Sequence, residues 1–403
     1  MKKLGFILLS AIAVSGCGAL KVAKLLKQGD VEQPSFTAEI PFEMRMGLVV
    51  VKVNINGKDY DFLVDTGAPN LVTKELAAEL KLKSKAEQKA GDSQGKKDVL
   101  QFTEMPEMLI GGVHFIEMGA AIADLKRSNE IACLDVDGFV GANLMKEAVW
   151  QFDYDRKVIT VADSISAFEI PASAFRIPFT PALSSTPLID ITYDGVADNK
   201  VTFDTGSNGH FNSSHGIYKS LKEKGKVTNS VVGYGATSSG LYGVGDGDSL
   251  YNLMITETKL GNLTIPEQVV AFDPGARTLG TKFLQHYRVI IDWSIKEIIL
   301  IPTDDFVNNT YETFGIRPFY NEDRLEVRMV TLGSEADKAG IKLGDRILEI
   351  NGRDVRVFTK EMWCDVINNG LVPENDTVIN LIISHDGQER AVRLNKKDMM
   401  KKE

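Results

Sequence analysis

Residues 48–73, LVVVKVNINGKDYDFLVDTGAPNLVT, decide the fold of this 403-residue chain. Apolar and polar residues alternate over residues 49–55, which indicates a half-buried antiparallel strand. Asn56-Gly57 is typical of a tight hairpin turn, and a second apolar strand then runs directly into Asp65-Thr66-Gly67. The stretch therefore predicts a β-hairpin that carries an aspartate at the end of its second strand.

The same pattern occurs again in residues 188–211, LIDITYDGVADNKVTFDTGSNGHF, where the second strand runs into Asp204-Thr205-Gly206. Each copy is followed by an apolar residue and a glycine, Val140-Gly141 in the first and Leu279-Gly280 in the second. The offsets agree, because 204 − 65 = 139 and 280 − 141 = 139. Two separate motifs that keep one offset indicate a duplication, and so two similar lobes of mainly β structure.

These motifs resemble those of the pepsin and retroviral aspartic proteases, over residues 36–303. The resemblance implies a cleft between two lobes, in which Asp65 and Asp204 form a catalytic dyad that hydrolyses peptide bonds. It also implies that the threonines hydrogen-bond across the lobe junction and that the glycine N–H groups point at the carboxylates. The supporting residues expected on this basis are Thr66, Gly67, Thr205, Gly206 and Ser207.

The chemistry explains why two aspartates are needed. One ionised carboxylate can accept the proton of a water, and one protonated carboxyl can donate to the substrate carbonyl. Two adjacent carboxyls cannot both ionise easily, so they share a proton. Ser207 can hydrogen-bond Asp204, whereas Ala68 cannot do so for Asp65, which predicts that Asp204 is the more readily ionised. The alternative is a duplicated fold without activity, that is, a catalytically silent peptide-binding lipoprotein.

The covering element of the cleft departs from the pepsin pattern, in which a flap of the first lobe carries a tyrosine. Residues 91–109 contain no tyrosine, although their polar stretch can form a hairpin tip. The second lobe has a glycine-rich segment, residues 232–245, with Tyr234 and Tyr242. We expect this segment to be a mobile lid whose tyrosines reach substrate. The alternative is a surface loop with incidental aromatic residues.

Residues 334–355, SEADKAGIKLGDRILEINGRDV, resemble the core of a PDZ domain. The resemblance covers residues 311–397 and implies a small α+β domain. It places the carboxylate-binding loop at Phe314-Gly315-Ile316 and a groove helix at residues 359–369. Such domains bind a peptide as an added strand and hold its C-terminal carboxylate. We therefore expect a peptide C-terminus as a partner, which would recruit substrate or gate the cleft.

The N-terminus resembles a bacterial lipoprotein signal. Lys2 and Lys3 precede an apolar stretch, residues 4–14, that is too short to span a membrane, and small residues then lead to Cys17. The resemblance implies a signal peptide over residues 1–16, acylation of Cys17 and a tether over residues 17–35. It places the protein in the bacterial cell envelope outside the cytoplasm, in the periplasm or on the cell surface. An uncleaved anchor or an ordinary signal peptide is the alternative.

The rest of the chain completes the predicted organisation. Lobe 1 is expected at residues 36–170 and lobe 2 at 188–305, with a proline-rich crossing at 171–187. The net charge of −9, without basic runs, argues against a nucleic-acid partner. The histidines form no metal-binding motif, so neither a metal nor a cofactor is expected. Cys133 and Cys364 lie far apart in the sequence and are expected to be free, buried thiols.

Overall fold

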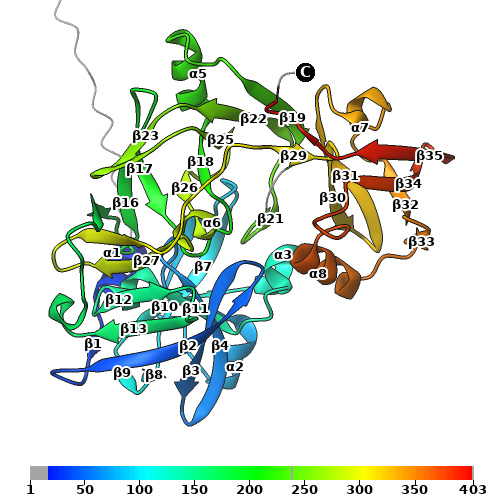
Figure 1. The fold of residues 1–403 in the computed structure, drawn as a ribbon. Coiled ribbons are helices and arrows are strands. Elements are labelled where there is room, and N and C mark those ends of the chain that lie inside the picture. Colours follow the sequence, from blue (N-terminus) through cyan, green and yellow to red (C-terminus); the bar gives the residue numbers. More distant parts are fainter. Residues whose placement is uncertain (1–16, 237–238, 402–403) are drawn as a thin grey trace, which may run out of the picture.

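A computed structural model describes residues 17–236 and 239–401 of the chain. The predicted signal peptide, residues 1–16, lies outside the described residues. Two large β units and a smaller domain follow one another along the chain (Figure 1). The mainly β class with a C-terminal PDZ domain is thereby confirmed.

Lobe 1 is built around the hairpin predicted from residues 48–73, whose inward-facing side chains are almost fully buried. Asn56 and Gly57 have φ values of 54° and 84°, as the predicted tight turn requires. The elements are β2 (Thr37–Arg45), β3 (Leu48–Ile55), β4 (Lys58–Asp65), β5 (Leu71–Thr73), α2 (Lys74–Glu79), β6 (Ala86–Gly91), β7 (Lys97–Glu104), β8 (Met108–Ile110), β9 (Val113–Ile116), β10 (Gly119–Ala123), η1 (Leu125–Arg127), α3 (Asn129–Ala132), β11 (Gly138–Gly141), α4 (Ala142–Met145), β12 (Val149–Asp153) and β13 (Val158–Ala162).

Lobe 2 repeats this plan with additional short strands. Its elements are β16 (Pro187–Tyr193), β17 (Val196–Phe203), β18 (Phe211–Ser214), α5 (His215–Glu223), β19 (Ser230–Gly235), β20 (Ser239–Gly240), β21 (Gly243–Val244), β22 (Asp248–Ile255), β23 (Thr258–Leu260), β24 (Leu263–Ile265), β25 (Gln268–Asp273), β26 (Thr278–Leu279), α6 (Thr281–Leu284), β27 (Tyr287–Asp292) and β28 (Glu297–Pro302).

The two lobes have the same strand pairing around each Asp-Thr-Gly. Lobe 1 contains the order β3-β4-β11-β5-β10, and lobe 2 contains β16-β17-β26-β18-β25. In both, the strand that leads to the aspartate is parallel to the later strand of the repeat, β4 with β11 and β17 with β26. The register places Asp65 beside Gly141, and the N–H of Asp204 donates to the carbonyl of Leu279 at 3.0 Å. The downstream motif of each repeat is therefore the neighbour of its aspartate.

A third layer joins the lobes through the pairing of β12 with β27. The resulting order is β14-β28-β27-β12-β13-β2, which mixes strands of both halves. The proline-rich crossing contributes edge strands to the sheets, since β14 (Phe175–Pro178) pairs with β28 and β15 (Thr180–Pro181) with β16. Prolines suit these edges because an edge strand does not need every backbone donor.

The PDZ domain has its own hydrophobic core around Phe319, Leu325 and Trp363. Its strand β31 also pairs with β19, so its sheet continues that of lobe 2. The predicted turn at Asn351-Gly352 has the expected φ values of 48° and 84°. The elements are β29 (Glu312–Thr313), β30 (Ile316–Asn321), β31 (Arg324–Thr331), α7 (Glu335–Lys338), β32 (Arg346–Ile350), β33 (Arg353–Asp354), α8 (Lys360–Asn369), β34 (Val378–His385), β35 (Gln388–Asn395) and β36 (Lys397–Asp398).

The prediction of free thiols is wrong, because Cys133 and Cys364 form a disulfide. Cys133 follows α3 in lobe 1 and Cys364 lies in α8 of the PDZ domain, and the two helices lie side by side (Figure 1). The fold brings their Cα atoms to 5.2 Å across a sequence separation of 231. A separation of that length gives no local signal of pairing, which is why the sequence did not reveal it.

The segment predicted as a tether is partly folded onto lobe 1, which corrects that expectation. Helix α1 (Cys17–Lys27) buries Val22, Leu25 and Leu26 against the flank of lobe 1 that includes Phe102. A short strand, β1 (Asp30–Val31), then pairs with β9. The cause is the amphipathic spacing of the apolar residues, because the lysines of α1 lie on its exposed side. Among the described residues, no helix is long and apolar enough to cross a membrane.

The docking of α1 predicts a stability difference between two leucines of one helix. Leu25 is 5% exposed and Leu20 is 76% exposed. Leu25→Asp should release α1 and lower the free energy of unfolding by about 2–3 kcal/mol, since it places a charge in an apolar contact. Leu20→Asp, the matched control, should change it by less than about 0.5 kcal/mol. Denaturant titration of a soluble form beginning at Gly18 measures both, and equal stabilities would show that α1 does not dock.

Candidate active site

The two aspartates of the repeats lie together at the junction of the lobes. Asp65 ends β4 and Asp204 directly follows β17. The two carboxyl groups are hydrogen-bonded to each other, and Asp65 is only 9% exposed. Gly67 N donates to Asp65 Oδ1 at 2.8 Å, and Gly206 N donates to Asp204 Oδ1 at 2.9 Å. Each carboxyl is thereby oriented by the turn of its own lobe.

The threonines of the two motifs form a symmetric network beneath the carboxyls. Thr66 Oγ1 donates to the carbonyl of Phe203 at 2.6 Å and accepts from Thr205 N at 3.0 Å. Thr205 Oγ1 donates to the carbonyl of Val64 at 2.8 Å and accepts from Thr66 N at 3.0 Å. Both threonines are fully buried. Four hydrogen bonds within a dry junction hold the two turns at one separation.

Glycine is required after each threonine because the opposite carboxyl occupies the space of a side chain. A Cβ at Gly67 would lie 2.6 Å from Asp204 Oδ1, and a Cβ at Gly206 would lie 2.4 Å from Asp65 Cγ. Real Cβ atoms do not approach other heavy atoms so closely. Each lobe therefore presents bare backbone to the aspartate of the other lobe, which sets the spacing of the pair.

Substituting these glycines is expected to separate the aspartates. In Gly67→Ala or Gly206→Ala the new methyl must push away a buried carboxyl, so any activity of the pair should fall at least about 100-fold, as shifts near 1 Å cost in other enzymes. Gly216→Ala is the matched control, because its Cβ would come no closer than 3.6 Å to a neighbouring atom. Initial rates of peptide cleavage measure the effect. Retention of full activity by both variants would contradict this geometry.

Burial raises the pKa of both aspartates. The pKa of Asp65 rises to about 6, since desolvation outweighs the hydrogen bonds from Gly67, Asp204 and Ala68. The pKa of Asp204 rises well above its usual value because of burial and then the nearby charge of Asp65. The pair therefore releases its first proton near pH 6 and holds its second proton to a higher pH. One carboxylate and one carboxylic acid coexist over that range.

The expected role of Ser207 in ionising Asp204 is not supported by the structure. The hydroxyl of Ser207 lies 3.3 Å from Thr278 Oγ1, which is its hydrogen-bonding partner. Only the backbone of Ser207 bonds to Asp204, and this contact is a minor influence beside burial. The contact proposed as the reason for an easier ionisation of Asp204 is therefore not formed, and which aspartate ionises first stays a prediction.

Two buried asparagines that the sequence did not single out support the first turn. Asn70 Oδ1 accepts from Gly141 N at 2.8 Å, and Asn143 Oδ1 accepts from Asn70 N at 2.6 Å. Both side-chain amides donate to the carbonyl of Gly119. They tie the segment after Asp65 to β10 and β11. Their only sequence signal was polarity within apolar stretches, which does not distinguish a buried network from a loop.

The predicted tyrosine lid differs from what the structure shows. Tyr234 lies in β19, which pairs with both β22 and β31, so it belongs to a sheet and is half exposed. Tyr242 is 9% exposed, and the guanidinium of Arg127 in lobe 1 lies 5.3 Å from its ring centroid. The polar stretch in lobe 1 does form a hairpin, β6–β7, with its tip at residues 92–96. Figure 1 shows β7 rising between the lobes.

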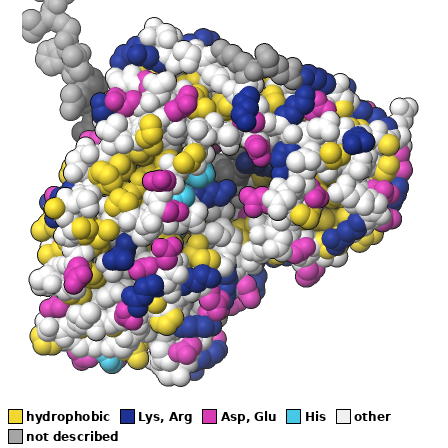
Figure 2. Space-filling view, in the orientation of Figure 1, with side chains coloured by type: hydrophobic (Ala, Val, Ile, Leu, Met, Phe, Trp, Pro, Cys, Tyr) yellow, Lys and Arg dark blue, Asp and Glu magenta, His cyan; other side chains and the backbone are white. Residues whose placement is uncertain are grey.

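The PDZ domain presents the elements of a peptide groove. The predicted loop contains Gly315 at φ 93°, and Ile316 begins β30. Among the described strands only β31 pairs with β30, and α8 packs against β30. Trp363 of α8 is buried and its ring packs against Phe319, so this side chain is part of the PDZ core. Figure 2 shows a hollow between the lobes and this domain, with charged side chains on its rim.

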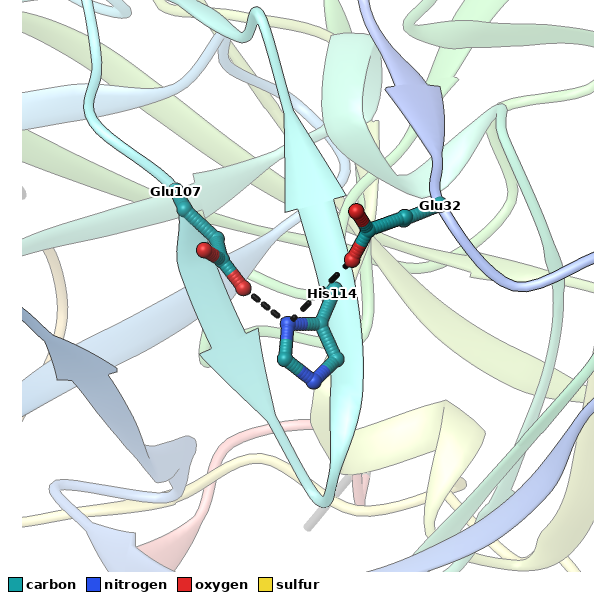
Figure 3. Close-up of side chains that lie close together, drawn as sticks. All are labelled: Glu32, Glu107 and His114. Carbon is teal, nitrogen blue, oxygen red and sulfur yellow. Dashed lines mark hydrogen bonds and ion pairs between the residues drawn. The ribbon is translucent and has the colours of Figure 1, made fainter.

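A separate cluster on the outer side of lobe 1 brings Glu32, Glu107 and His114 together (Figure 3). His114 Nδ1 is hydrogen-bonded to Glu107 and lies 3.8 Å from Glu32. Both glutamates are exposed, with side chains 66% and 50% accessible. The cluster links the residue after β1 to β9 and to the residue before β8. Its three ligand atoms lie within 4.8 Å of one another, a spacing that could hold a metal ion, although exposed acidic groups are common without one.

Comparison with known proteins agrees with two parts of this description. A family model described as aspartyl protease matches residues 51–144, and one described as PDZ domain matches residues 307–370. The first match contains Asp65 and the hairpin β6–β7, and the second contains the groove loop and α8. No curated protein matches the chain. The chain thus has an aspartyl protease-like domain and a C-terminal PDZ domain.

Proposed function

We propose that this protein is an aspartic endopeptidase in which Asp65 and Asp204 form the catalytic dyad. The observation that carries the proposal is the pair of buried, mutually hydrogen-bonded carboxyls, one from each repeat, with raised pKa values. In the singly protonated pair, the carboxylate takes a proton from a bound water and the carboxylic acid donates to the substrate carbonyl. The water then attacks the carbonyl carbon to give a tetrahedral diol. The diol collapses as the carboxyl that took the water proton gives a proton to the leaving nitrogen and the other carboxylate takes a proton from a diol hydroxyl, which breaks the C–N bond and restores the starting pair.

The working pH range follows from the two pKa values. Only the monoanionic pair has both an acid and a base. It accumulates as pH rises through about 6, the pKa of Asp65, and persists until the raised pKa of Asp204 is passed. We therefore propose that activity rises as pH increases through about 6.

The PDZ domain is proposed to recruit or gate peptide substrates through their C-termini. Support comes from β30, which among the described strands pairs only with β31 and lies beside α8, and from the family match over residues 307–370. The protein is further proposed to be lipid-anchored at Cys17 outside the cytoplasm. The Cys133–Cys364 disulfide supports an oxidising compartment. Since α1 begins at Cys17 and docks on lobe 1, the anchor would hold that lobe close to the bilayer surface.

The proposal is tested with a soluble form beginning at Gly18 and a broad peptide mixture. Cleavage between pH 4 and 9 is followed by mass spectrometry, with and without peptides that end in apolar residues as PDZ ligands. Cleavage by the wild type that is absent in Asp65→Asn and Asp204→Asn would support the dyad. Absence of cleavage by folded protein under all conditions would instead favour a silent peptide-binding lipoprotein.

A further inference from the structure

The tip of the β6–β7 hairpin is held by lobe 2, although it belongs to lobe 1. We call residues 86–104 the flap hairpin and residues 239–244 of lobe 2 the strap. Asp92 Oδ2 accepts from Tyr242 N of the strap at 2.9 Å. On the other side of the tip, Ala276 N donates to the carbonyl of Ser93 at 2.8 Å. The flap hairpin therefore bridges the lobes.

Asp92 uses its two oxygens for two different tasks. Its Oδ1 accepts from Gln94 N and Lys96 N, both at 3.0 Å, and so shapes the hairpin turn. Its Oδ2 is directed to the strap, where a Cβ at Gly240 would lie 2.5 Å from it. The Nζ of Lys96 adds a hydrogen bond to the carbonyl of Val244. One carboxylate thus orders the tip and joins it to the opposite lobe.

The joined elements reach the apolar surface beside the catalytic pair. Leu100 of the flap hairpin and Leu241 of the strap both pack on the hydrophobic cluster that contains Leu63, and Ala68 packs on the same cluster. Leu63 and Ala68 lie two residues before and three after Asp65 in the sequence. The flap hairpin and the strap therefore share one apolar cluster with the segment that carries Asp65.

We propose that Asp92 is a positioning residue that latches the flap hairpin to the strap during catalysis. This rests on the proposed peptidase function. The strap is itself anchored, because β19 before it pairs with β31 and Val244 packs on the PDZ core. The position of the flap hairpin therefore depends on the strap, which contacts the PDZ domain.

Because Asp92 uses one oxygen for the turn and the other for the strap, a substitution can break the latch and leave the turn intact. In Asp92→Asn the remaining oxygen can still accept from the turn amides, but the new NH₂ group faces the N–H of Tyr242, and two donors cannot bond. Gly240→Ala breaks the same contact from the strap side. The matched control in this loop is Gly247→Ala, whose Cβ comes no closer than 3.7 Å to another residue.

Two measurements test the latch. In the Asp204→Asn background, where cleavage plays no part, Asp92→Asn and Gly240→Ala should speed amide hydrogen exchange at residues 89–97 and 239–244 at least tenfold, and Gly247→Ala should not. In the active enzyme the same two variants should lower kcat/KM about tenfold, mainly through kcat. The pH profile should stay unchanged, because the catalytic pair is intact.

The outcomes separate the latch from the proposed function. Unchanged exchange in both variants would overturn the latch even if the wild type shows no peptidase activity. Faster exchange with unchanged kcat/KM would overturn its role in catalysis. A rise in kcat/KM would also overturn it and would identify the strap as an inhibitory cover instead.

Discussion

Asp65→Asn and Asp204→Asn are each expected to reduce kcat/KM for peptide cleavage by at least about a thousandfold. The reason is that in the proposed mechanism the two carboxyls share one proton and divide the acid and base roles, so neither can act alone. Asparagine keeps the size of the side chain and one oxygen for the N–H of Gly67 or Gly206. The double variant should be no worse than either single variant, because residues acting as a unit are not additive.

The same substitutions should stabilise the fold at neutral pH, which separates lost chemistry from lost structure. The pKa of Asp65 in the folded protein is about 6, above its ordinary value of 3.8. A raised pKa in an acid means that stability is fully present below pH 3.8 and is lost as pH rises through about 6. Asparagine does not ionise, so Asp65→Asn does not lose stability as pH rises. The variant should therefore be more stable than the wild type at pH 7 by up to about 3 kcal/mol. Denaturant titrations at pH 4 and 7 measure it; a variant that is inactive and less stable at pH 7 would contradict this account.

Loss of the Cys133–Cys364 disulfide should have the largest effect on stability. A bridge between residues 231 apart strongly reduces the conformational entropy of the unfolded chain. The loop-entropy model gives a stabilisation of the folded protein of about 5 kcal/mol from this effect. We expect a loss of about 3–5 kcal/mol in Cys133→Ser/Cys364→Ser, since lobe 2 and the PDZ domain remain joined by β19–β31 pairing and the two lobes by β12–β27 pairing. The midpoint of thermal unfolding reports the loss.

The soluble form beginning at Gly18 provides the control for this prediction. It contains only Cys133 and Cys364 of the three cysteines in the chain. Thiol titration of the unfolded, unreduced protein should therefore find no free thiol, and reduction should release two. If two thiols titrate without reduction, the bridge does not form, and the double serine variant should then match the wild type in stability.

The meeting of Asp65 and Asp204 at the lobe junction was predictable from the sequence because its determinants are local. Each Asp-Thr-Gly follows an alternating strand and a turn, and turn chemistry and side-chain period 2 act over a few residues. The constant offset of 139 between Asp65 and Asp204 added the one long-range fact, that the two turns are equivalent. The PDZ core was predictable for the same reason, since Gly340 and Asn351-Gly352 mark its turns locally.

The expectations that were corrected concern contacts between distant segments. The docking of α1 on lobe 1 depends on the apolar flank that the flap hairpin and β10 create together. Tyr234 looked like a lid residue because glycines surround it, but β31 of the PDZ domain takes it into a sheet. The hydroxyl of Ser207 had two polar neighbours within reach, and the fold selected Thr278 over Asp204.

The sequence by itself determined the two repeats, their aspartates and the order of domains, because strand patterning and turn residues encode these features within short windows. Only the tertiary structure decided the burial of the Asp65 and Asp204 carboxyls against each other, the Cys133–Cys364 bridge and the hydrogen bond from Tyr242 N to Asp92. Each of these requires two segments at least 100 residues apart to meet at hydrogen-bonding or covalent distance. The free energy that brings them together comes from burying the surfaces between them, and no single stretch of sequence contains both surfaces.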